Sequence, residues 1–223
     1  ECVFIRRGPR EEANGGGTGR TGGMGKPALY GPGMEEHKDD QTIATMLILG
    51  EVAKKVAEYK SEIIVSCCIP IVREVAEEVV RAGFTQAGYA DDYRSVNTRF
   101  ISSEQFAFCA GTNGIILREK PATNLYFGRF FAESLILSEP GFVNRSIQIA
   151  GTAEATQLPF FIAACDYTLI GEELFAVSAY LSRDPRLVSS LKASDWIKVF
   201  CVTCLVVGTV LATFGIDFMS TLF

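Results

Sequence analysis

The sequence predicts an α/β protein: a Rossmann-like three-layer domain with a mostly parallel sheet, followed by a C-terminal transmembrane helix. Short β-rich runs alternate with segments of helical periodicity, which is the pattern of βαβ units with right-handed crossovers. Several of these runs are continuously apolar, as expected for a sheet covered on both faces. The last 25 residues contain one charged side chain, although the whole chain has 21 basic and 26 acidic residues. A partial barrel is the alternative, because six units are too few for an eightfold one.

The first half of the domain contains two such units. Residues 28–30 form a predicted strand that ends in the turn Gly31-Pro32-Gly33. Apolar residues at helical spacing predict a helix over 42–59, for which Asp39 or Asp40 is a suitable cap. The apolar run 63–65 predicts a second strand. Pro70 suits the first turn of the next helix, which we expect to end near Gly83.

The second half continues the alternation. Residues 98–101 form a predicted strand, after which Ser102 and Gln105 have the spacing of a capping box. That helix is expected to end near Gly111 or Gly114. A strand over 124–127 precedes a helix that continues through Leu137 and stops before Pro140. The remaining predicted elements are strands over 147–150 and 167–170 and a helix over 172–181.

The C-terminal segment is predicted to cross a membrane. Residues 199–216 are 18 consecutive uncharged residues, about 27 Å of helix, which is close to the thickness of the hydrocarbon layer. Trp196 suits the interface, and Lys192 and Lys198 precede the span while only Asp217 follows it. By the positive-inside rule this places the main domain in the cytoplasm, at the cell membrane. A buried core helix is the alternative.

The organisation before and after the domain follows from composition. Residues 1–10 are interpreted as a juxtamembrane segment, because an apolar patch ends in three arginines; a processed terminus or an edge strand is the alternative. Residues 11–27 form a glycine-rich linker, 28–195 the cytoplasmic α/β domain, and 196–223 the transmembrane helix and tail. The linker is not a phosphate-binding loop, because Arg20 and Pro27 stand where that motif requires glycine and Ser or Thr.

Candidate ligand-binding residues follow the ends of predicted strands. Ligands of open parallel sheets bind beyond the carboxyl ends of the strands, where loops and helix N-termini meet. The residues that the strand assignment places there are Gly31, Gly33, Ser66, Cys67, Thr152 and Glu154. Small hydroxyl side chains and backbone amides suit an anion, but the same residues also suit turns and caps.

The sequence contains no coherent catalytic or metal-binding set. The one histidine, His37, lies in a polar stretch, so neither a histidine-based triad nor a multi-histidine metal site is expected. The seven scattered cysteines are expected to be reduced thiols. Cys67 is a candidate nucleophile because it ends a predicted strand. We therefore predict no catalytic residue, metal or cofactor, although an enzyme is not excluded.

Two late carboxylates, Asp166 and Glu172, lie among apolar neighbours, so we expect at least one to be partly buried. A buried carboxylate is normally paired or hydrogen-bonded. Pairing with Arg118, Arg129 or another subunit is the favoured role, and catalysis is the alternative.

Residues 147–185 resemble the signature block of an uncharacterised bacterial family, a domain of unknown function in predicted membrane proteins. Upstream pieces at 39–44, 104–107 and 118–124 resemble it as well, so the likeness covers about residues 26–198. The resemblance implies a cytoplasmic α/β domain attached to transmembrane helices, with no established activity. The glycine-rich linker departs from it, because a more helix-forming segment is expected there.

Two hypotheses about function follow. The first is a non-enzymatic, membrane-anchored assembly protein that forms a homo- or hetero-oligomeric array, since the apolar and aromatic content exceeds the needs of one small core. Its partners would be the lipid bilayer, further copies and other membrane subunits, without nucleic acid. The second is a membrane-tethered enzyme or small-ligand sensor that uses the strand ends, with Ser66, Thr152 and Glu154 as the first residues to test.

Overall fold

The computed structural model describes residues 26–34, 39–182 and 185–213 of the 223-residue chain. Strands and helices alternate through most of this range, and the chain divides into two compact units between α7 and α8. The elements are β1 (Ala28–Gly31), α2 (Asp40–Glu58), β2 (Ile63–Cys67), α3 (Pro70–Gln86), the short 3-10 helices η1 (Ala90–Asp92) and η2 (Ser95–Asn97), β3 (Thr98–Phe100), α4 (Gln105–Glu119), β4 (Thr123–Phe127), α5 (Ser134–Val143), β5 (Ile147–Thr152), α6 (Leu158–Ala164), β6 (Tyr167–Ile170), α7 (Glu173–Ser182) and α8 (Pro185–Thr213).

The six strands form one parallel sheet in the order β3-β2-β1-β4-β5-β6. Leu29 of β1 is in register with Ile64 of β2 on one side and with Asn124 of β4 on the other. The sheet is open, with β3 and β6 at its edges, so the Rossmann-like prediction is confirmed and the partial barrel is wrong. Strands β1, β2 and β3 follow one another toward one edge of the sheet, and β4, β5 and β6 follow one another toward the other edge. The order of the strands therefore reverses between the neighbours β1 and β4.

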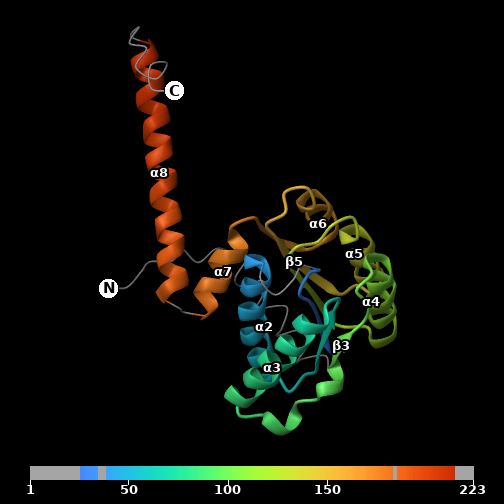
Figure 1. Ribbon diagram of the computed structural model, residues 1–223. Helices are drawn as coiled ribbons and strands as arrows, with labels where there is room; N and C mark the ends of the chain where they lie inside the picture. The colour runs from blue at the N-terminus through green and yellow to red at the C-terminus, as the bar shows by residue number, and fades with distance from the viewer. Residues whose placement is uncertain (1–25, 35–38, 183–184, 214–223) are drawn as a thin grey trace. The chain divides into compact units, whose positions relative to one another are not determined.

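Helices cover both faces of the sheet because successive strand residues point to opposite sides. Ala28 and Tyr30 belong to the core beneath α2, α3 and α7, whereas Leu29 between them belongs to the core beneath α4, α5 and α6. Figure 1 shows α2 and α3 on one side of the sheet and α4, α5 and α6 on the other. The continuously apolar runs at 28–30 and 63–65 are thereby explained, since neither face of these strands meets water.

The starts of the first two long helices agree with the sequence prediction. Asp39 caps α2, and its carboxylate accepts a hydrogen bond from the Gln41 amide at 3.2 Å. Pro70 lies in the first turn of α3, where its missing N–H costs no helical hydrogen bond. The helix that follows β3 begins differently from the prediction. Its cap is Glu104, which accepts from the Ala107 amide at 2.7 Å, so the predicted capping box is wrong.

Three predicted helix ends are wrong, because the glycines and the proline that suggested them lie inside the helices. Helix α3 continues past Gly83 to Gln86, and α4 continues past Gly111 and Gly114. A Cβ at Gly111 would lie 2.2 Å from Cγ2 of Ile101, so the glycine lets α4 pass this side chain. Helix α5 contains Pro140.

Pro140 is tolerated inside α5 because a neighbouring helix satisfies the carbonyl that proline leaves without a donor. Proline has no N–H for the carbonyl four residues earlier. The side-chain amide of Asn113, from α4, donates to the Ile136 carbonyl at 3.1 Å. Helix α6, over Leu158–Ala164, was not predicted from the sequence.

Helix α8 is, among the described residues, one helix long and apolar enough to cross a membrane, over Pro185–Val210. Its apolar side chains, including Phe200 and Leu205, are exposed, whereas those of a core helix are buried. The tail from residue 214 lies outside the described residues, as do the predicted juxtamembrane segment 1–10 and most of the glycine-rich linker.

Candidate functional site at the carboxyl edge of the sheet

The reversal between β1 and β4 defines the place where open parallel sheets bind ligands. Helix α2 leaves β1 toward one face of the sheet, and α5 leaves β4 toward the other. In sheets of this kind, ligands bind outside the carboxyl ends of the strands at such a switch point. The residues that follow β1, β4 and β5 lie at this edge.

The loops after β1 and β4 touch through their backbones at two glycines. Gly33 has φ +81°, and a Cβ there would lie 2.9 Å from both the nitrogen and the oxygen of Arg129. Gly128 has φ +118°, and its Cβ would lie 2.7 Å from the Pro32 oxygen. The Met34 amide donates to the Arg129 carbonyl at 3.0 Å. Only glycine combines this left-handed backbone with so close an approach, so the glycines hold the two loops together.

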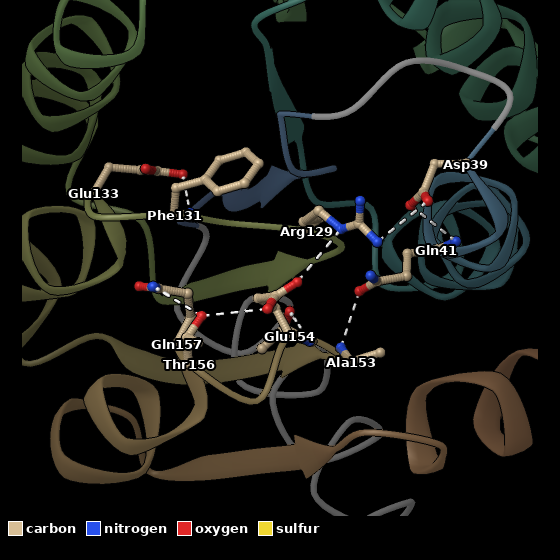
Figure 2. Close-up of polar contacts among 10 residues, drawn as sticks. Asp39, Gln41, Arg129, Phe131, Glu133, Ala153, Glu154, Thr156 and Gln157 are labelled. Atoms are coloured by element: carbon tan, nitrogen blue, oxygen red, sulfur yellow. Dashed lines mark hydrogen bonds and ion pairs between the residues drawn. The ribbon is translucent and has the colours of Figure 1, made fainter.

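Arg129 links three parts of the edge. Its guanidinium lies 3.7 Å from an Asp39 oxygen at the start of α2 and 3.7 Å from a Glu154 oxygen after β5. Figure 2 shows the arginine between these two carboxylates. The side-chain oxygen of Gln41, in the first turn of α2, accepts from the Ala153 amide at 2.9 Å. We call Asp39, Gln41, Arg129 and Glu154 the switch-point cluster.

The switch-point cluster contains two carboxylates and one guanidinium, so acidic groups outnumber the basic one. The three charged side chains are all partly exposed, and ion pairs of this kind contribute about 0–1 kcal/mol to stability. An anionic ligand would have to compete with two carboxylates for the same guanidinium. The cluster is therefore organised to tie α2, β4 and β5 together.

The predicted site residues all lie at this edge, because parallel strands end on the same side, but most of their side chains face inward. Ser66 and Cys67 end β2 and Thr152 ends β5, and all three are fully buried. The Thr152 hydroxyl accepts from the Glu154 amide at 3.1 Å. Gly31 ends β1 and Gly33 forms the loop contact described above. Of the six residues, Glu154 is the one with a partly exposed charged group at the edge.

Burial governs the chemistry of the thiols. It raises the pKa of Cys67, and the neighbouring Cys68 adds to this shift. The thiol of Cys68 donates to the Gly33 carbonyl at 3.3 Å. Nucleophilic cysteines need a lowered pKa and access to solvent, so the environment of Cys67 favours a neutral, unreactive thiol.

The buried carboxylate of the domain is Glu133, which sequence reasoning missed. It accepts from the Phe131 amide at 2.8 Å and from the side-chain amide of Gln105. Figure 2 shows Glu133 turned toward Phe131, beside the switch-point cluster. The expectation that Asp166 or Glu172 is partly buried is wrong, because both remain exposed. Asp166 lies at the rim of the sheet, where it accepts from the Gln148 amide at 2.8 Å.

Arg129 is a candidate functional residue at the carboxyl edge that was not predicted from the sequence. It is the first charged residue after the strand β4, a signal visible in the sequence. That signal has meaning only once β4 is known to lie beside β1. Within the described ranges, no group of three or more His, Cys, Asp or Glu side chains could hold a metal ion, and His37 lies outside them.

The fold and this edge define the class of protein: a Rossmann-like α/β domain followed by a helix that is long and apolar enough to span a membrane. Residues 1–223 match the family described as DUF6754, a domain of unknown function, and the chain belongs to that family. No curated protein and no solved structure matches the chain.

Proposed function

We propose that this chain is a non-enzymatic assembly protein, anchored in the membrane by α8, whose α/β domains associate with one another in the cytoplasm. The proposal depends mainly on one observation, an exposed apolar surface on the helical layer formed by α4, α5 and α6. We call it the α5 surface. Its main members are Leu135, Ile136, Phe142 and Val143 of α5 and Phe160 and Ile162 of α6.

Helix α5 has apolar side chains on both sides, and Glu139 is its one charged residue. Leu137 is fully buried and packs in the core with Phe161. On the other side, Phe142 is 76% exposed and Val143 is 67% exposed. Surface helices usually present polar side chains to water, and groups of exposed apolar side chains are found at interaction sites. The α5 surface therefore supports association with another macromolecule.

Membrane anchoring strengthens the case for self-association. Copies held in one bilayer by α8 share an orientation and a high effective concentration, so a modest surface is sufficient for assembly. Lys192 and Lys198, which precede the uncharged part of α8 that begins at Val199, support a cytoplasmic position for the domain.

The test is the mass of the full-length chain in mild detergent, measured by light scattering. We expect a uniform particle of several chains, and a monomer would contradict the proposal. The double variant Phe142→Ser/Val143→Ser should lower the mass. Val96→Ser is the matched control, since Val96 is 71% exposed in η2, outside the α4–α6 layer. An unchanged mass in the double variant would assign any assembly to α8 or to another surface.

A second candidate function is the binding of a small polar ligand at the carboxyl edge, supported by the position of Arg129 at the switch point. Native mass spectrometry of the purified chain tests it. A retained small molecule that is lost in Arg129→Met would support this function. Absence of any retained mass, together with no thermal shift from a panel of nucleotides, would count against it.

A further inference from the structure

The α5 surface contains a regular stripe of side chains along its helix. Leu135 and Phe142 are seven residues apart, and so are Ile136 and Val143, which places the four side chains on one side of two helical turns. All four are exposed, from 40% for Ile136 to 76% for Phe142. This stripe is the part of α5 that a second molecule can cover.

A carboxylate lies in the middle of the stripe. Glu139 is four residues after Leu135 and three residues before Phe142, so it lies on the same side of the helix. It is exposed, and within the described residues its side chain forms no ion pair. Burial of a charge without a partner is costly. A molecule that covers the stripe therefore has to bring a cation to Glu139.

Arg145 supplies a cation on the same surface. It is exposed and lies three residues after Phe142, whereas Glu139 lies three residues before it. In the described part of the domain the other arginines, except Arg118, lie in ion pairs, but Arg145 forms none. Phe142 is therefore flanked by one unpaired acidic and one unpaired basic side chain, at the same spacing in sequence.

We infer that the α5 surfaces of two copies pack against each other about a two-fold axis that passes near Phe142. This inference rests on the proposed assembly function and specifies its contact. In a two-fold contact the same surface serves both copies, so every pair of residues occurs twice. With antiparallel α5 helices, Phe142 meets Phe142 of the other copy, and Glu139 of each copy meets Arg145 of the other. Parallel helices would bring the two glutamates together, and such contacts of like charge are unfavourable.

The size of the apolar part fits such an interface. The six main members of the α5 surface are on average about half exposed, and together they offer roughly 300–550 Å² per copy. Each partner in a standard-size interface buries about 800 Å², of which a little over half is apolar. These side chains therefore account for the apolar part of the interface, and Glu139 and Arg145 belong to its polar part.

A two-fold contact has a defined consequence for the particle. Each α5 surface is occupied by one other copy, so this contact alone ends at two chains. A larger particle needs a second contact, such as one between α8 helices, and it then contains an even number of chains. Both chains of a pair can insert α8 from the same side of the bilayer when the axis is perpendicular to the membrane.

The experiment reverses the two charges in the full-length chain, and light scattering in mild detergent measures the particle mass. Glu139→Arg brings arginines together and Arg145→Glu brings glutamates together, so each variant should have at most half of the wild-type mass. An equimolar mixture of the two variants should recover the wild-type mass, because one chain then offers two basic and the other two acidic side chains. The double variant Glu139→Arg/Arg145→Glu should recover it with a single kind of chain.

Two control variants should assemble like the wild type. Asp91→Arg makes the same change of charge at an exposed position in η1. Ile43→Ser/Val75→Ser removes two exposed apolar side chains from an apolar groove that lies along α2 and α3, on the opposite face of the sheet from α5. A circular dichroism spectrum like that of the wild type establishes that each variant is folded.

The outcomes separate this contact from the function on which it rests. A monomeric wild type would refute the assembly function itself. Loss of mass in Phe142→Ser/Val143→Ser, with both charge variants at the wild-type mass, would retain that function and overturn the two-fold contact. Loss of mass in both charge variants, without recovery in the mixture or in the double variant, would show that the α5 surface contacts a different surface of the next copy. An odd number of chains, or a second polypeptide lost from the charge variants, would also overturn the inference.

Discussion

Replacement of Gly33 by alanine is expected to destabilise the α/β domain more than the same replacement at Gly88. The two glycines have almost the same φ, +81° at Gly33 and +82° at Gly88. They differ in their surroundings. A Cβ at Gly33 would lie 2.9 Å from the backbone of Arg129, whereas a Cβ at Gly88 would meet no atom within 4 Å. The comparison therefore isolates the contact between the loops after β1 and β4.

The expected magnitudes follow from two separate costs. A left-handed backbone costs an L side chain about 1–2 kcal/mol, and both variants bear this cost. Insertion of a methyl group into a packed contact costs about 1–3 kcal/mol more, and only Gly33→Ala bears it. Backbone atoms at 2.9 Å cannot turn aside as a flexible side chain can, so the Met34–Arg129 hydrogen bond should lengthen as well. We expect losses of about 2–5 kcal/mol for Gly33→Ala and about 1–2 kcal/mol for Gly88→Ala.

The assay is thermal unfolding of the full-length chain in detergent, followed by far-ultraviolet circular dichroism. The signal of α8 is common to both variants and cancels in the comparison. For a domain of this size, a further loss of about 1–3 kcal/mol lowers the Tm by roughly 2–12 °C. Gly171→Ala is a second control, since Gly171 has φ +58° and nothing within 4 Å. Equal Tm values for Gly33→Ala and Gly88→Ala would refute the view that this contact constrains the edge.

Two further predictions concern the core. Phe161→Ala should lower the free energy of unfolding by about 3–5 kcal/mol, because Phe161 is fully buried and packs on Phe130 with ring centroids 5.3 Å apart. Urea unfolding measures this loss, and Phe160→Ala is the control, since Phe160 is 44% exposed and should lose far less. Similar losses in the two variants would contradict the assigned core. Burial raises the pKa of the Cys165 thiol to about 12, and the charge of Asp166 adds to this. An unfolded thiol titrates near pH 8.5, so between about 8.5 and 12 the unfolded chain loses its proton first and the free energy of unfolding falls as pH rises. Urea midpoints at pH 7.5 and 10 should therefore differ less in Cys165→Ala than in the wild type, and an equal difference would exclude this contribution.

Much of the fold could be predicted because its signals are local. The continuously apolar runs at 28–30 and 63–65 indicated strands covered on both faces, and Asp39 and Pro70 marked the starts of helices correctly. Parallel strands then placed Gly33, Ser66 and Thr152 at one edge without any knowledge of strand order. The reason is physical: side-chain periodicity and caps act over a few residues and are visible along the chain.

The errors occurred where a residue serves a distant partner. Gly111 resembled a helix end but accommodates Ile101, and Pro140 resembled a stop but is compensated by Asn113 of another helix. Asp166 resembled a buried acid because its sequence neighbours are apolar, whereas the buried acid is Glu133. Sequence proximity does not determine burial, since that depends on which element packs above the residue.

By itself, the sequence determined that this protein has alternating strands and helices, an apolar C-terminal helix and polar residues at the strand ends. The tertiary structure decided that β1 lies beside β4, and only this order brings Arg129 between Asp39 and Glu154. It also decided that Phe142 and Val143 face outward while an apolar groove lies on the opposite face of the sheet. Apolar residues are equally suited to a core and to an interface, and the packing of the other elements determines which of them remain uncovered.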